Sequence, residues 1–231
     1  MPRTKTTTVD TATGEFNPSI IHVRITFLES VLGSQPGDPE IYSTYIGSKS
    51  PDTQSTLEEE IAALGQDAVE ARAKTVFPRT ADGKPFVYDY QWKGFFKDNC
   101  AALRGVPGTR SSGFKAYKKA IDGRIFVSPR QILFDGVTAA DLTDCQRSLR
   151  ASTPMGDRVA LANSEQVPAG TTQRFDIICF NPDDTKLVRE WLNFGRYRGF
   201  GQWRNSGRGR FLWDELDDEG AVIGGNMEVL G

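Results

Sequence analysis

The chain is poor in the residues that most often bind transition metals. It has one histidine, His22, and three cysteines, Cys100, Cys145 and Cys179, among 231 residues. A zinc site needs several such ligands at close spacing, and these four are scattered along the chain. We therefore expect no metal site and no cofactor. The odd number of widely spaced cysteines is typical of a reducing, intracellular setting.

Long apolar runs are also missing. A membrane-spanning helix takes about 20 mainly apolar residues, and no stretch of this chain approaches that length. Residues 1–8 lack the apolar centre of a signal peptide, which predicts that the chain is not exported. We expect a cytoplasmic protein without a membrane partner.

Charge is abundant but unevenly divided. The formal net charge is only −2. Residues 91–210 hold 20 Lys and Arg against 11 Asp and Glu, a balance of +9, and the remainder holds 8 against 19, a balance of −11. Such asymmetry is typical of contact with a polyanion or of self-association between unlike surfaces, although many of these side chains are expected to be simply solvated.

Local patterns predict a mixture of strands and helices. Residues 20–27 are β-branched and partly alternating, which predicts a first strand. Phe95, Phe96 and Cys100 have helical spacing and predict a helix that begins near Trp92. Further strands are expected at 86–90, 124–127, 131–134, 158–162, 173–180 and 211–213, and further helices at 55–73 and 183–194, with Gly195 as the C-cap of the last.

This order of elements predicts an α+β sandwich close to the ferredoxin-like arrangement, with an antiparallel sheet and helices on one face. The domain is expected to span 19–215, with loop insertions at about 33–80 and 105–120. Threonine-rich residues 1–18 are expected to form a flexible arm. Acidic, glycine-rich residues 216–231 are expected to form a tail.

The segment 199–211 combines glycine, arginine and tryptophan between a predicted helix and a predicted strand. Glycine lets a backbone approach a phosphate closely, and the arginine fork fits phosphate oxygens. A tryptophan such as Trp203 can stack a base, although a place in the core or in a subunit interface is equally typical of it. The candidate binding residues here are Gly201, Trp203, Arg204, Gly207, Arg208, Gly209 and Arg210.

Further candidates come from the rest of the basic region. Lys93 and Gly94 are expected at a helix N-terminus, where backbone N–H groups bind phosphate, although Lys93 also fits a solvated lysine at a helix start. The remaining candidates for nucleic-acid binding are Lys97, Arg104, Lys115, Arg147 and Arg150.

Four motifs, in order, resemble those of the RAMP superfamily, which supplies the backbone subunits of CRISPR effector complexes. Residues 91–97 resemble its G-S-S-L-K-G-x-x-R signature, and 122–127 its G-R-L-x-V strand. Residues 165–171 resemble its E-x-V-P-x-G-T turn, and 199–211 its glycine-rich loop G-G-x-R-S-x-G-x-G-R. The chain departs from these patterns where Trp92 replaces a small serine and where Gln202 and Trp203 interrupt the glycines.

The resemblance implies a modified RNA-recognition-motif fold that grips a nucleic-acid backbone without cutting it. The implied ligand is single-stranded RNA or DNA, with RNA the first expectation. The implied assembly is a head-to-tail homo-oligomer, as a filament or ring, or a subunit of a ribonucleoprotein complex. A further resemblance to bacteriophage and prophage gene products implies a solitary, phage-encoded member acting in a bacterial cytoplasm.

Two alternatives remain open. Some relatives cleave RNA with a loop aspartate or a histidine, and the matching candidates here are Asp38, Asp52 and His22. Aspartates in a loop rich in proline and glycine are more typical of turns, however. The other alternative is a structural or interaction protein, such as a virion-associated one, whose unlike charged surfaces dock on each other without nucleic acid.

Overall fold

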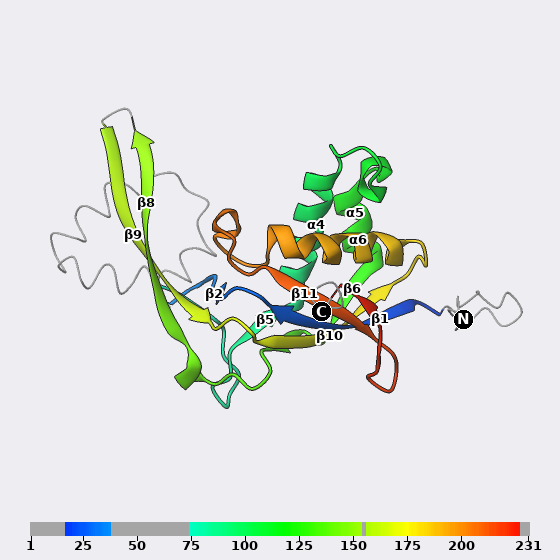
Figure 1. Ribbon diagram of the computed structural model, residues 1–231, viewed down its shortest axis with the longest axis horizontal. Helices are drawn as coiled ribbons and strands as arrows, with labels where there is room; N and C mark the ends of the chain where they lie inside the picture. Colours follow the sequence, from blue (N-terminus) through cyan, green and yellow to red (C-terminus); the bar gives the residue numbers. More distant parts are fainter. Residues whose placement is uncertain (1–16, 38–73, 154–155, 227–231) are drawn as a thin grey trace, which may run out of the picture.

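The computed structural model describes residues 17–37, 74–153 and 156–226. Its centre is a five-stranded antiparallel sheet in the order β12-β11-β1-β10-β6, with helices over one face (Figure 1). These layers contain β1 (Ser19–Phe27), α4 (Asp89–Leu103), β6 (Ile125–Ser128), β10 (Thr172–Cys179), α6 (Asp184–Arg198), β11 (Phe211–Leu216) and β12 (Val222–Gly225).

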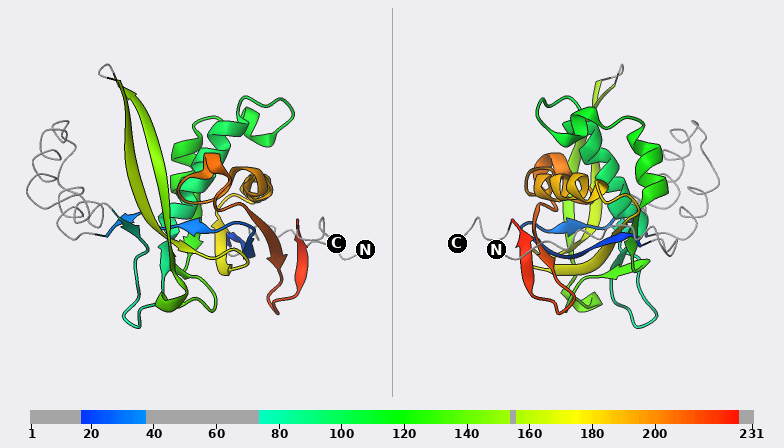
Figure 2. Two further views of the ribbon diagram at one scale, coloured as in Figure 1. Left: turned by 60° about the vertical axis from the view of Figure 1, so that its left-hand side comes forward. Right: turned by 90° about the vertical axis from the view of Figure 1, so that its right-hand side faces the viewer.

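The connection of these elements is that of a ferredoxin-like fold. Along the chain they run β1-α4-β6-β10-α6-β11, and in space the four strands lie in the order β11-β1-β10-β6. This is the β-α-β-β-α-β pattern, and both helices pack on the same side of the sheet (Figure 2). The predicted α+β, ferredoxin-like fold class is confirmed.

The core lies between the sheet and the helices. Ile21, Val23, Ile25 and Phe27 alternate along β1 and are fully buried, whereas the residues between them point to the opposite face. Helix α4 buries its apolar face against them at helical spacing. Burial of each such large side chain stabilises the fold by about 1.5–3 kcal/mol.

Along the chain, several shorter elements connect the strands of the central sheet. They are β2 (Val31–Leu32), β3 (Gln35–Pro36), β4 (Thr75–Val76), β5 (Phe86–Tyr88), a 3₁₀ turn (Arg110–Gly113), α5 (Tyr117–Arg124), β7 (Gln131–Leu133) and a second 3₁₀ turn (Ala139–Asp141). Helix α5 begins inside the loop insertion expected at about 105–120 and continues beyond it. Its only fully buried side chain is Ile121, so the segment carries little of the periodicity that signals a helix.

The longest departure from expectation is a β-hairpin that stands away from the sheet (Figure 1). It consists of β8 (Thr143–Thr153) and β9 (Gly156–Val167), paired in continuous register from Thr143 opposite Gln166 to Thr153 opposite Gly156. The pattern predicts only a strand at 158–162 here. At the base of β8 the more buried positions are Cys145 and Arg147, and an inward arginine breaks the apolar alternation that marks a strand.

Helix α6 continues beyond its predicted end. Gly195 lies inside the helix, where a Cβ would come within 2.1 Å of Phe211 Cζ. The glycine therefore permits close packing of α6 on β11, and the predicted C-cap role of Gly195 is wrong. The residue that follows the helix is Gly199, with a positive φ of 74°.

The two ends of the predicted domain differ. Strand β12 pairs with β11 and extends the sheet, so the described part of the expected tail, up to Asn226, belongs to the fold. The expected arm up to residue 16 and the expected helix at 55–73 lie outside the described residues. Within the part of the chain that the structure describes, none of the helices has the length and apolar character needed to cross a bilayer.

Candidate nucleic-acid interface

The loop between α6 and β11, residues 199–210, is closed at its neck by backbone hydrogen bonds. The Phe200 N–H donates to the Gly209 carbonyl at 2.8 Å, and the Gly209 N–H donates to the Ser30 carbonyl at 3.0 Å. Phe200 is buried and stacks on Trp92 with ring centroids 4.3 Å apart. Trp92 thus forms the surface in the core to which the loop is attached.

Two glycines make this neck possible. Gly199 and Gly209 both have positive φ, and a Cβ on Gly209 would lie 2.0 Å from the Phe200 carbonyl oxygen. Side chains at these positions would force the two arms of the loop apart. Gly201 lies against Val31, and Gly207 lies beside Arg210, so the loop glycines contact the protein's own chain.

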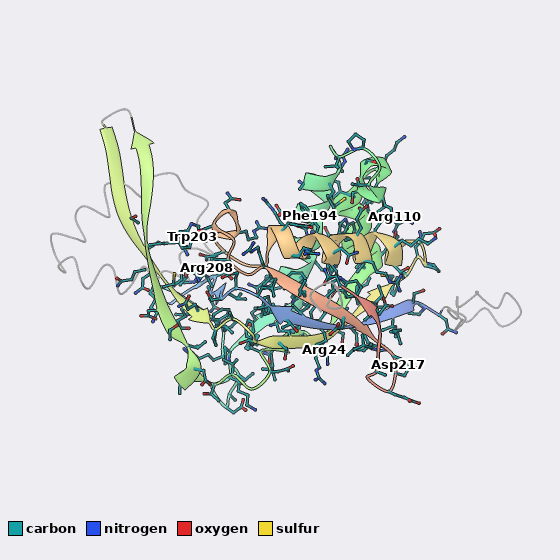
Figure 3. All side chains as sticks on the ribbon, viewed as in Figure 1. Arg24, Arg110, Phe194, Trp203, Arg208 and Asp217 are labelled. Atoms are coloured by element: carbon teal, nitrogen blue, oxygen red, sulfur yellow. The ribbon has the colours of Figure 1, made fainter. Side chains whose placement is uncertain are left out.

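The tip of the loop presents Trp203 close to two guanidinium groups. Trp203 has a left-handed backbone conformation and is 37% exposed. The Cζ atom of Arg147 lies 5.1 Å from the Trp203 ring centroid, and that of Arg208 lies 5.8 Å from it. Both distances allow cation–π attraction. We call Arg147, Trp203 and Arg208 the open cluster, and Figure 3 shows two of its members beside the hairpin.

No carboxylate within the described residues forms an ion pair with either arginine of the open cluster. Arg147 Nη2 donates to Gln202 Oε1 at 3.0 Å, but its Nε and Nη1 are buried without a hydrogen-bond partner. Arg208 Nη1 donates to Ser30 Oγ, and Nη2 lies 4.0 Å from Cys145 Sγ. Buried donors without partners are costly, so an outward movement of the Arg147 side chain that brings these two donors to an anion is favoured.

The other loop arginines are paired within the protein. Arg204 Nη1 donates to Asp98 Oδ2 at 2.7 Å, and Arg198 Nε donates to the same oxygen at 2.9 Å. Arg210 Nη2 lies 3.1 Å from Glu29 Oε1. Burial acts to raise the pKa of Asp98, but Arg198 and Arg204 outweigh it and the net pKa is lowered. The carboxylate is therefore charged at neutral pH.

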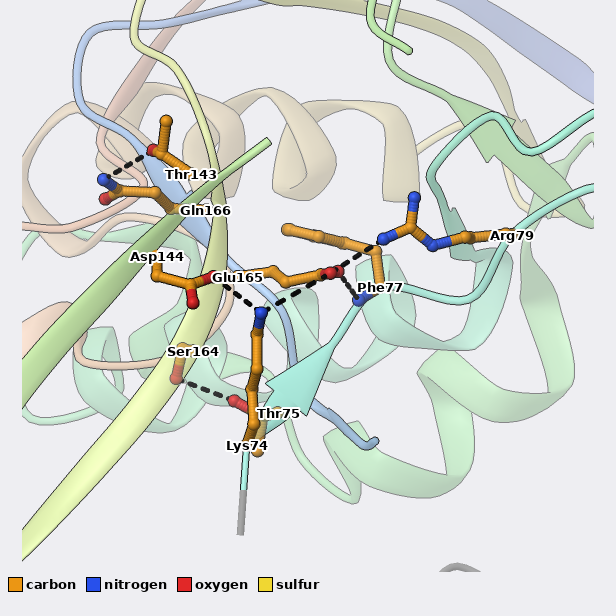
Figure 4. A network of polar contacts seen from close by, with 9 residues as sticks. All are labelled: Lys74, Thr75, Phe77, Arg79, Thr143, Asp144, Ser164, Glu165 and Gln166. Carbon is orange, nitrogen blue, oxygen red and sulfur yellow. Dashed lines mark hydrogen bonds and ion pairs between the residues drawn. The ribbon is translucent and has the colours of Figure 1, made fainter. Parts of the chain in front are cut away.

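A separate network of polar contacts holds the base of the hairpin that carries Arg147 (Figure 4). Glu165 of β9 accepts from Arg79 Nη2 at 2.7 Å and from the Phe77 N–H at 3.2 Å. Lys74 Nζ lies 2.7 Å from Asp144 Oδ1 of β8. Glu165, the first residue of the third family-like motif, thus holds the base of the hairpin against the chain that follows β4.

Lys93 and Gly94 do not lie at a helix N-terminus. Helix α4 begins at Asp89, so both fall in its second turn, and this part of the prediction is wrong. Lys93 Nζ donates to the Asp122 carbonyl at 3.1 Å and lies over the Phe126 ring, while Lys97 pairs with the Asp122 carboxylate at 2.6 Å. Burial lowers the pKa of Lys93. These lysines face α5 and β6, away from the open cluster.

The remaining candidates are dispersed. Arg104 packs on the Tyr117 ring, with 5.3 Å from Cζ to the ring centroid, and Lys115 is exposed. Arg150 lies on β8 opposite Val159, but its side chain falls outside the described part.

Of the three residues of the nuclease alternative, only His22 lies within the described residues. His22 lies on β1, with Nδ1 2.7 Å from Asp176 Oδ1 and Nε2 3.3 Å from Asp218 Oδ1. Asp38 and Asp52 lie outside the described residues. Across the part that is described, no group of three or more His, Cys, Asp or Glu side chains is arranged to hold a metal ion.

The sequence pattern missed Asp98. It lies 106 positions from Arg204 and 100 from Arg198, and its nearest acidic neighbours in the sequence are Asp89 and Asp122. Its isolation in that region is the only signal that points to it.

No protein-family model matches the chain, and no curated protein matches it. Among solved structures, a chain in the cryo-EM structure of the Type III-B Cmr-beta bound to cognate target RNA is similar, with a TM-score of 0.48 and 12% identity. The similarity covers 84% of this chain and 58% of that chain, so this chain spans little more than half of its length. This likeness adds no residue to the site.

Proposed function

We propose that the protein binds single-stranded nucleic acid, with RNA as the first ligand, without sequence preference and without cutting it. The open cluster carries the proposal. Two guanidinium groups share one partly exposed indole and form no ion pair with a carboxylate of the described residues. RNA comes first because the resemblance of the four motifs to the RAMP superfamily implies it.

The chemistry of the cluster favours a single strand over other anions. An exposed aromatic ring stacks an unpaired base, which contributes about 1–3 kcal/mol per base. Guanidinium groups bind the neighbouring phosphates through charged, paired hydrogen bonds. The adjacent amide side chain of Gln202, which could read a base edge, already has its oxygen engaged with Arg147. Binding is therefore expected to depend on the backbone and on stacking.

The same proposal includes self-assembly. The basic region 91–210 and the acidic remainder have opposite balances of +9 and −11, which favours head-to-tail contact between copies. We propose a filament, a ring or a place in a ribonucleoprotein complex. Size-exclusion fractions, with absorbance ratios read before and after RNase and DNase, identify both the bound nucleic acid and the assembly. A clean protein oligomer unchanged by either enzyme would instead favour an interaction protein.

The decisive test is Arg147→Gln. Fluorescence anisotropy with a labelled oligouridylate and the matching oligodeoxythymidylate measures Kd over a range of salt concentrations. We expect Arg147→Gln to weaken binding about tenfold, roughly the worth of one charged hydrogen bond. We also expect the salt dependence to become shallower by about 0.7 in the log–log slope, since one phosphate contact is lost.

Arg174→Gln is the matched control. The Arg174 side chain is 64% exposed on the open face of the sheet, and its Nε lies 3.6 Å from Asp135 Oδ2. The substitution removes the same charge but should change Kd less than about twofold. Equal losses of affinity in the two variants would show that binding depends on net charge and not on the open cluster. No binding by the wild-type chain would refute the proposal.

A further inference from the structure

Asp98 occupies a position in which one carboxylate joins three elements. It projects from α4 toward Arg198 at the end of α6 and Arg204 in the loop, and both guanidinium groups donate to the same oxygen, Oδ2. Arg198 Nη2 also reaches Oδ1 at 3.4 Å. Asp98 therefore holds two arginines next to the proposed interface.

We propose that Asp98 competes with nucleic-acid phosphates for Arg204 and Arg198 and thereby limits the affinity of the interface. The inference rests on the proposed function. Carboxylate and phosphate oxygens accept the same donors of the guanidinium fork. An arginine bound to Asp98 is thus already oriented for an anion but is not free to bind one.

The exposure of the three side chains makes this exchange of carboxylate for phosphate feasible. The side chains of Asp98, Arg198 and Arg204 are 30%, 33% and 29% exposed. Ion pairs that water reaches are weak, whereas a strand that gains a phosphate contact also releases counterions. Phosphates can therefore replace Asp98 at the arginines, but each replacement breaks one ion pair between Asp98 and an arginine.

The two sets of arginines then have different roles. Arg147 and Arg208 have no competing carboxylate among the described residues, so they bind the strand directly. Arg198 and Arg204 bind it only after Asp98 has released them. Removal of the Asp98 charge should strengthen binding and make it more dependent on salt, which a merely structural role for Asp98 does not predict.

The test measures the binding of labelled oligouridylate by full-length Asp98→Asn and, as a second neutral replacement, Asp98→Ser. We expect Kd to fall about three- to tenfold at low salt, the range of one or two weak ion pairs. The log–log salt slope should steepen by about 0.7 for each arginine that is released. Circular dichroism and melting temperature establish that both variants fold.

Asp218→Asn is the charge-matched control. The Asp218 side chain is 98% exposed and lies in the turn that also contains Asp217, far from Trp203 in Figure 3. The substitution removes one negative charge without releasing Arg198 or Arg204. An equal gain in affinity in this control would overturn the inference.

A double-mutant cycle separates the inference from the proposed function. In an Arg204→Gln, Arg198→Gln background, Asp98→Asn should no longer strengthen binding, because no arginine remains for it to release. If the wild-type chain binds RNA but Asp98→Asn binds equally or more weakly, Asp98 is not a competitor and only the inference fails. If the wild-type chain binds no nucleic acid, the proposed function fails first.

Discussion

The open face of the sheet and the open cluster both carry basic side chains, but among the described residues carboxylates compensate them only on the sheet. On the sheet, Arg24 makes two hydrogen bonds to Asp214 Oδ2, at 2.7 and 3.0 Å, and His22 contacts Asp176 at 2.7 Å. Arg147 and Arg208 instead pack on Trp203. An RNA recognition motif binds bases on aromatic residues of its sheet, but ion pairs fill the middle of that face here.

We place the candidate interface by this difference in charge pairing, which the fold alone does not reveal. A ferredoxin-like sheet directs attention to its open face, where the positive charges named above are already neutralised. The loop offers positive charge and an exposed ring together. Asp98 and its two arginines are intermediate: they lie beside the loop, but the arginines form ion pairs, as Arg24 does on the sheet.

The largest expected effect comes from opening the neck of the loop. In Gly209→Ala, the new Cβ would meet the Phe200 carbonyl, and the residue would keep a φ of 67°. We expect a loss of about 3 kcal/mol in the free energy of unfolding, from backbone strain and overlap. Urea denaturation measures it. RNA binding should fall as well, because the neck holds Trp203 and Arg208 in place.

Gly83→Ala isolates the part of that effect that comes from backbone strain. Gly83 has a similar φ of 80°, but nothing lies within 4 Å of its Cβ position. We expect a loss of about 1 kcal/mol and unchanged RNA binding. Equal losses in the two variants would show that the neck is not tightly packed.

A smaller effect is expected on the sheet, from Arg24→Gln. The Asp214 side chain is only 4% exposed, so loss of its partner leaves a buried carboxylate with a weaker donor. We expect the free energy of unfolding to drop by about 2 kcal/mol, measured in urea. RNA affinity should stay within about twofold of wild type. A loss of affinity as large as that of Arg147→Gln would remove the distinction between the two regions.

The smallest effect concerns pH. The pKa of His22 is raised from its usual 6.5, first by the hydrogen bond to Asp176 and further by Asp218, although burial opposes this. The charged histidine stabilises the fold, so its contribution is complete below about pH 6.5 and is lost as pH rises through the higher folded-state pKa. Because Asp218 is exposed, we expect less than about 1 kcal/mol.

Urea midpoints at about pH 5.5 and about pH 8.5 measure this change in the wild type and in His22→Gln. The wild type should lose stability at the higher pH relative to the variant. RNA binding by the two proteins should have the same pH dependence, since His22 lies on the sheet and not in the open cluster. A difference in binding between them would link the two regions.

Local patterns predicted the fold where each element has its own periodicity. The alternation of Ile21, Val23, Ile25 and Phe27 marks β1, and Phe95, Phe96 and Cys100 mark α4. The patterns failed for α5, which buries little, and for the β8–β9 hairpin, in which an arginine takes an inward position. Helix α5 and the base of the hairpin lack a regular apolar face, so local periodicity does not mark them.

For the site, the composition of 199–210 by itself determined which stretch to consider, because glycine and arginine carry their conformational and ionic properties wherever they occur. Only the tertiary structure decided which arginines are open. Arg204 pairs with Asp98, which is 106 positions away in the sequence, and Arg147 donates to Gln202, which is 55 positions away. Pairing of charges depends on distances in the folded chain, and no local pattern records a contact between residues so far apart.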